Sequence, residues 1–180
     1  HMVVATPDEK KLYVANIRSG TVTVIERAGG RVTSVATGEG AEGIDVSPDG
    51  REVWVGNRAS NTITILGAAS DTVIASFPSG GEMPIRVKFT PDGRQAWVSN
   101  ARSASVTVFD VAGRKLIGTI AVGAVPVGIQ MAPDGKRAFV ACTNDDVVKV
   151  IEVGKRRVAG DLKTGKEPDG MAWAGTRAKK

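Results

Sequence analysis

The sequence has few of the residues on which catalytic sites are commonly built. Its 180 residues include one cysteine, Cys142, and one histidine, His1. We interpret residues 1–2 as a cloning scar, so catalytic triads and dyads that need a native histidine base are excluded. A single cysteine excludes a disulfide within the chain and leaves the redox compartment open. Without a base to activate it, Cys142 is interpreted as a small, partly buried thiol.

Long hydrophobic runs and helical periodicity are also missing. No apolar run approaches the roughly 18 residues that a membrane-spanning helix needs. No segment longer than a turn repeats with the helical period, so no helix is predicted, and a glycine-rich phosphate loop has no helix to open. Hydrophobic residues make up 42% of the chain, which suffices for one core or one stack of repeats. The net charge of +5 permits an anionic partner without requiring one.

The chain instead contains four copies of one pattern, in which a Pro-Asp turn is followed by a short apolar strand. The prolines that open the copies are Pro7, Pro48, Pro91 and Pro133, so successive copies are 41, 43 and 42 residues apart. Proline fixes one backbone angle of such a turn, and the glycine that follows in three copies tolerates a positive φ. A period near forty with four short strands predicts an all-β fold of four antiparallel four-stranded β-propeller blades.

The repeats are predicted to extend over residues 3–175, and residues 176–180 are predicted to form a frayed basic tail. The last unit has material for one strand only, an extra inner strand at Asp169–Ala174. Glycine-rich segments such as Gly38–Gly43 are expected to carry the chain from the outer strand of one blade to the inner strand of the next. The units begin near Val3, Ala41, Pro84, Pro126 and Pro168.

The residues that recur in each copy are interpreted as architectural. Equal spacing of the aromatic residues indicates packing between adjacent blades rather than a platform for stacking bases or sugars. The asparagines are expected to satisfy backbone groups at the end of the second strand, and the turn aspartates to cap their own backbone. No metal site and no cofactor are predicted; Asp145-Asp146 is the one place where a cation would be sought. The recurring residues are Tyr13, Trp54, Trp97 and Phe139; Asn16, Asn57 and Asn100; and Asp49, Asp92 and Asp134.

These copies resemble the YVTN family of bacterial β-propeller repeats, which is named for a Tyr-Val-Thr-Asn signature. The signature stands here as Tyr13-Val14-Ala15-Asn16, and in its fourth copy as Phe139-Val140-Ala141-Cys142, without the asparagine. The resemblance implies a fold rather than an activity. In the family, complete rings usually have seven blades and many members are exported, which implies a periplasmic or extracellular location. This chain has material for four blades.

Two faces of the predicted propeller carry charge. Four arginines lie on the loops that follow the second and fourth strands, and they are the candidate ligand-binding residues for an anion: Arg18, Arg58, Arg86 and Arg102. The turns of the opposite face carry nearly as many acidic as basic residues, as around Arg51, which stands between Asp49 and Glu52. A soluble face is therefore favoured there over a nucleic-acid platform, which remains an alternative.

The function predicted from these observations is a non-enzymatic module for binding or assembly. The alternative is an enzyme or enzyme subunit, because propellers of similar construction include lactonases and subunits of oxidoreductases. Such propellers bring carboxylates or histidines to the axis, where this chain has Asp45, Lys88 and Gln130. The other expected partner is an unknown protein or an anionic ligand.

A second copy of the chain is the partner expected for assembly. An open arc of four blades leaves two apolar blade faces uncovered, so two copies are expected to pair into a ring of eight blades. Aligned on the repeat, Val3 matches Met171 and Thr6 matches Ala174. The last strand is therefore predicted to take the inner position in the partner's first blade. A closed ring of four blades and a fragment of a longer propeller are the alternatives.

Overall fold

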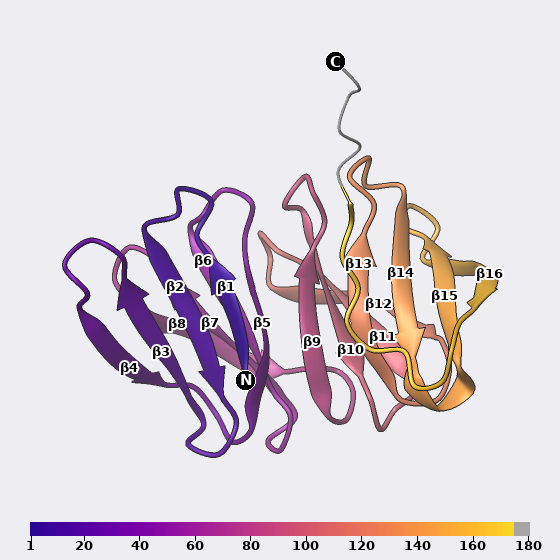
Figure 1. The fold of residues 1–180 in the computed structure, drawn as a ribbon, viewed down its shortest axis with the longest axis horizontal. Coiled ribbons are helices and arrows are strands. Elements are labelled where there is room, and N and C mark those ends of the chain that lie inside the picture. Colours follow the sequence, from indigo (N-terminus) through magenta and orange to yellow (C-terminus); the bar gives the residue numbers. More distant parts are fainter. Residues whose placement is uncertain (175–180) are drawn as a thin grey trace.

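The computed structural model describes residues 1–174, which form four antiparallel sheets of four strands each, placed side by side in an arc (Figure 1). This confirms the prediction of an all-β fold with four blades. In each sheet the strands follow one another in sequence order from the inner to the outer edge. Among the described residues, no helix is long and apolar enough to cross a membrane.

The strand bounds follow the repeat closely. Blade 1 contains β1 (Met2–Ala5), β2 (Lys11–Asn16), β3 (Thr21–Glu26) and β4 (Val32–Ala36). Blade 2 contains β5 (Ala41–Val46), β6 (Glu52–Asn57), β7 (Thr62–Gly67) and β8 (Thr72–Pro78). Blade 3 contains β9 (Pro84–Phe89), β10 (Gln95–Asn100), β11 (Ser105–Asp110) and β12 (Lys115–Ala121). Blade 4 contains β13 (Pro126–Met131), β14 (Arg137–Cys142), the short 3-10 turn η1 (Thr143–Asp145), β15 (Val147–Glu152) and β16 (Arg157–Lys163).

The Pro-Asp-Gly turns are built by local hydrogen bonds. In blade 2 the carboxylate of Asp49 accepts hydrogen bonds from the Ser47 hydroxyl at 2.6 Å and from the Arg51 backbone N–H at 3.0 Å. Gly50 follows with a φ of +72°, a conformation that suits glycine. These hydrogen bonds hold the pKa of Asp49 below its usual value, with the Ser47 hydroxyl as the main cause. Residues close together in sequence therefore form the turn between the first and second strands of the blade.

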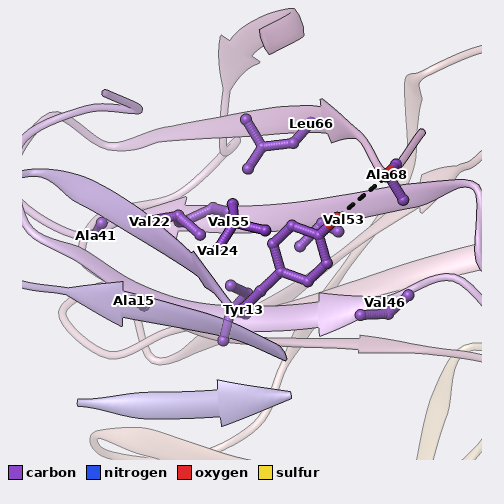
Figure 2. Packing of buried hydrophobic residues seen from close by; sticks show 11 residues of the cluster. Tyr13, Ala15, Val22, Val24, Ala41, Val46, Val53, Val55, Leu66 and Ala68 are labelled. Atoms are coloured by element: carbon purple, nitrogen blue, oxygen red, sulfur yellow. Dashed lines mark hydrogen bonds between the residues drawn. The ribbon is translucent and has the colours of Figure 1, made fainter. Parts of the chain in front are cut away.

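The core consists of three apolar clusters, one between each pair of adjacent blades. Between blades 1 and 2, Tyr13 packs among Val53, Val55 and Leu66, as Figure 2 shows. Its hydroxyl donates to the carboxylate of Asp71 at 2.7 Å, and burial raises the pKa of the phenol. The other two clusters join blade 2 to blade 3 and blade 3 to blade 4. Within residues 1–174 no such cluster joins blade 4 to blade 1, so the arc is open.

The segment after β16 differs from the prediction. A strand was expected over Asp169–Ala174, but these residues form no sheet ladder within the described part of the chain. The segment passes beside β13 (Figure 1). A strand requires a neighbouring strand for its N–H and C=O groups, and within residues 1–174 no strand pairs with this segment. The basic tail predicted at residues 176–180 lies outside the described residues.

Candidate assembly surfaces and axial cluster

The inner strands bring the predicted axial residues Asp45, Lys88 and Gln130 to one cavity, where Asp45 and Lys88 are engaged with each other. Asp45 is 9% exposed, and its carboxylate accepts hydrogen bonds from the Phe89 backbone N–H at 3.1 Å and from Lys88 Nζ at 3.3 Å. Burial raises the pKa of Asp45, and the positive charge of Lys88 opposes that rise. The side-chain amide of Gln130 donates to the Met131 carbonyl at 3.0 Å. Among residues 1–174 no group of three or more histidine, cysteine or acidic side chains is arranged to hold a metal ion.

The four candidate arginines do not form one site. Arg18 and Arg58 line one cavity of about 690 Å³, and Glu39 stands in the same cavity. Arg58 is held by Glu42, whose carboxylate lies 2.8 Å from its guanidinium. Arg102 is exposed and lies on a different loop, after β10. The structure thus brings two of the four together, beside a carboxylate that would repel an anion.

Arg86 has a separate role on the inner face of the arc. Its guanidinium lies 3.1 Å from the carboxylate of Asp169, and 2.8 Å from the sulfur of Met2. Its Nε donates to the Val127 carbonyl at 3.4 Å. One side chain of blade 3 therefore touches the inner strand of blade 1 and the segment that follows blade 4. Arg86 stands where the other blades have Gly43 and Gly128, but the sequence alone does not reveal these partners.

Many charges on the face that carries the Pro-Asp turns are paired with neighbours on the same face. Arg114 lies 2.8 Å from Glu52, and Lys155 lies 2.8 Å from Glu152. Further pairs join the turn residues Arg51 to Asp49, Arg94 to Asp92, Arg27 to Glu9 and Arg31 to Glu26. Close pairing of opposite charges weakens the field that a basic nucleic-acid platform needs.

The signature asparagines, and Cys142 in the fourth copy, are the last residues of the second strand in their blades. The amide of Asn57 donates to the hydroxyl of Thr64 at 2.9 Å, and that hydroxyl donates to the Thr37 carbonyl at 3.1 Å. Asn100 repeats this arrangement through Thr107, and Asn16 donates to Thr23 at 2.8 Å. Through these threonines, Asn57 and Asn100 help to fix the segments that cross between blades.

Cys142 and the acidic pair Asp145-Asp146 lie near the last crossing segment. Cys142 is fully buried, and burial raises the pKa of its thiol to about 11, which keeps it protonated near neutral pH. Asp145 accepts a hydrogen bond from the Ala124 backbone N–H at 2.7 Å. Asp146 accepts one from the Glu167 backbone N–H at 2.9 Å. The two carboxylates are thus occupied by backbone groups.

Blade 1 presents an uncovered apolar face on the side away from blade 2. Across its strands, Ala5 pairs with Leu12, Leu12 with Ile25, and Ile25 with Val32. Val32 is 61% exposed. In blade 2 the same repeat positions carry Val53 and Leu66, which are fully buried against blade 1. We call the residues Val3, Ala5, Leu12, Val14, Ile25 and Val32 the leading face.

Blade 4 has an apolar face on the side away from blade 3. Phe139 pairs across the sheet with Val150, and Val148 pairs with Leu162, which is 50% exposed. At the same repeat position in blade 3, Ile120 is 5% exposed because blade 4 covers it. We call the residues Phe139, Val148, Val150 and Leu162 the trailing face. A leading face and a trailing face meet at each of the three blade junctions inside the arc.

The segment after β16 lies against the trailing face. The indole of Trp173 packs on the ring of Phe139, with 6.1 Å between the ring centroids. The Thr143 hydroxyl donates to the Pro168 carbonyl at 2.9 Å, and Asp169 reaches Arg86. Trp173 is 49% exposed, so one side of the indole remains uncovered. We call residues 165–174 the terminal segment.

Four-stranded blades around a common inner edge define the class of this protein as a β-propeller. The sequence profile of the YNCE-like β-propeller family matches residues 1–133, and the chain belongs to that family. A search of curated proteins returned no significant match.

Two solved structures share the fold. Hydrazine synthase from Kuenenia stuttgartiensis superposes with a TM-score of 0.83 at 23% identity, covering 88% of this chain and 47% of that one. A candidate 6-phosphogluconolactonase from Bacteroides fragilis superposes with a TM-score of 0.80 at 20% identity, covering 94% of this chain and 56% of that one. The chain thus spans about half the length of each. At these identities the similarity concerns the fold alone.

Proposed function

We propose that this chain is a non-enzymatic assembly module, and that two copies pair head to tail into an eight-bladed ring. In that ring the trailing face of each copy lies against the leading face of the other. The same contact then occurs twice about a twofold axis, which closes the assembly.

The observation that carries this proposal is the pair of complementary apolar faces, of which the leading face is uncovered and the trailing face is only partly covered by the terminal segment. Their residues occupy the repeat positions that are buried at the three internal junctions, as the pair Leu162 and Ile120 illustrates. Large contiguous apolar patches are uncommon on soluble monomers. In a ring of eight blades each blade spans about 45°, so each arc of four blades has to span half a circle.

The axial cluster favours a non-enzymatic role. The carboxylate of Asp45 is engaged by the Lys88 ammonium group and by the Phe89 backbone N–H. General acid–base chemistry needs a group that can reach the substrate with its proton or lone pair free. A lactone-hydrolysis assay checks this part of the proposal, and turnover that is lost in Asp45→Asn contradicts it.

Pairing is tested with one substitution on the leading face and one away from both faces. Val14→Lys places a charge in the middle of the leading face, whereas Ile74→Lys alters an exposed apolar residue on β8 of blade 2. In sedimentation velocity, we expect the unmodified chain and Ile74→Lys to sediment as dimers, and Val14→Lys as a monomer. A dimer that is indifferent to Val14→Lys contradicts pairing through this face.

A further inference from the structure

The terminal segment occupies the place of a fifth inner strand, in the register of the repeat. Trp173 follows Phe89 by 84 residues and Met131 by 42, two periods and one. Its contact with Phe139 repeats the contact of Phe89 with Trp54, where the ring centroids are 5.7 Å apart. Trp173 therefore fills the position that an inner strand takes at each internal junction.

Two further contacts repeat the internal junctions. The Glu167 backbone N–H donates to Asp146 just as the Met83 backbone N–H donates to Asn61, at 2.9 Å and 2.8 Å. Gly128 lies against the backbone of Asp169, as Gly43 lies against the backbone of Ile85 and Arg86. The segment is thus seated as an inner strand, but it lacks the ladder that a second strand would give it.

In the proposed ring, the terminal segment of one copy and β1 of the other would both occupy the inner position of the same blade. The fifth blade seen from one copy is blade 1 of the partner, whose inner place is held by its own β1. The terminal segment and the partner's β1 cannot both fill it. Pairing of the two copies therefore requires one of them to leave.

The side chain that each segment presents to the preceding blade indicates which of the two occupies the inner position. At the internal junctions this position carries Val46, Phe89 and Met131, which are all buried. The terminal segment offers Trp173 there, whereas β1 offers Ala5. An alanine opposite Phe139 would leave a void where every other junction is filled, and voids cost stability.

We infer that the terminal segment supplies the inner strand of the partner's blade 1, and that β1 is displaced there. By the register of β1 on β2, Trp173 then lies opposite Leu12 of the partner subunit, and Met171 opposite Val14 of the partner subunit. The ladder lost with β1 is replaced by one with the incoming strand, and the segment gains the hydrogen bonds that it lacks alone. This inference rests on the proposed pairing of two copies.

The first test compares two substitutions in the full chain. Strand exchange predicts that Trp173→Ala weakens the dimer at least about tenfold, while Ala5→Asp leaves it unchanged or tighter, because β1 is outside the junction. If β1 instead stays in place, Ala5→Asp breaks the dimer and Trp173→Ala does not, which overturns the inference. A monomeric unmodified chain overturns the proposed function itself, so the two failures are distinguishable.

The second test locks β1 in its own blade. Val3 and Val14 are paired in register, so Val3→Cys with Val14→Cys, in a Cys142→Ala background, allows a disulfide between β1 and β2. We expect the oxidised chain to be a monomer and the same chain after reduction to be a dimer, as measured by sedimentation velocity. A dimer that survives oxidation contradicts the exchange.

Discussion

The guanidinium of Arg86 on β9 lies 3.1 Å from the carboxylate of Asp169, which is 83 residues later in the chain. This pair connects the third blade to the terminal segment across the inner face of the arc. Because Asp169 is mostly exposed, the free energy of the pair is small, at most about 1 kcal/mol. It positions the segment more than it stabilises the fold.

We expect Arg86→Gln to loosen the terminal segment without unfolding the blades. Trypsin cleavage after the exposed Lys166 of the terminal segment should speed up, while hydrogen exchange within β9 and β10 stays unchanged. Arg102→Gln is the matched control, because Arg102 is exposed and forms no ion pair within residues 1–174. An unchanged rate of cleavage after Lys166 in Arg86→Gln contradicts the assigned role.

The two aromatic positions Trp54 and Phe139 should differ in their effect on stability. They occupy the same step of the repeat, but Trp54 is fully buried between blades, whereas Phe139 faces the trailing side. Trp54→Ala should lower the free energy of unfolding by about 3–5 kcal/mol. Under monomeric conditions, obtained with Val14→Lys, Phe139→Ala should cost clearly less, as measured by denaturant unfolding. Equal losses would mean that the trailing face is already covered.

Acid should lower the free energy of unfolding by protonating the aspartates of the turns. The pKa of Asp49 is held below its usual value in the folded chain, chiefly by the Ser47 hydroxyl. The folded state therefore binds this proton less tightly than the unfolded chain, whose carboxyl keeps the ordinary value of 3.8. Stability from Asp49 is present above pH 3.8 and is lost as the pH falls through the folded pKa.

The corresponding experiment compares Asp49→Asn with the unmodified chain from pH 7 down to pH 2.5. We expect Asp49→Asn to be less stable at pH 7 and the difference to shrink at low pH. A difference that is constant over this range would show that charge has no part in the turn.

The contribution of Asp45 to stability should depend on pH in the opposite direction to that of Asp49. Burial raises its pKa in the folded chain, so the folded state binds the proton more tightly than the unfolded chain does. The contribution of Asp45 to stability should therefore fall as the pH rises from 3.8 through the raised pKa. Thermal unfolding of Asp45→Asn should lack this component, and an identical pH profile in both proteins contradicts it.

The blades could be predicted from the sequence because their signals are local. Pro48-Asp49-Gly50 makes its turn with hydrogen bonds to residues two positions away, and β-branched alternation defines the strand that follows. Because this signal occurs in four copies, all sixteen strands can be predicted without information on contacts between residues far apart in sequence.

The site was harder to predict because its contacts are distant. Nothing near Arg86 in sequence indicates Asp169, and the charge pattern could not show that Arg18 and Arg58 share a cavity while Arg102 lies elsewhere. The strand expected at Asp169–Ala174 failed for the same reason. Its apolar pattern is that of an inner strand, but a strand also needs a partner, which the pattern alone does not supply.

The mass of the unmodified chain in solution tests the central claim most directly. Light scattering coupled to size exclusion, repeated over about a hundredfold range of concentration, measures it independently of shape. The account predicts a species of about 37 kDa, twice the chain mass of 18.7 kDa. A monodisperse species near 18.7 kDa at every concentration contradicts it.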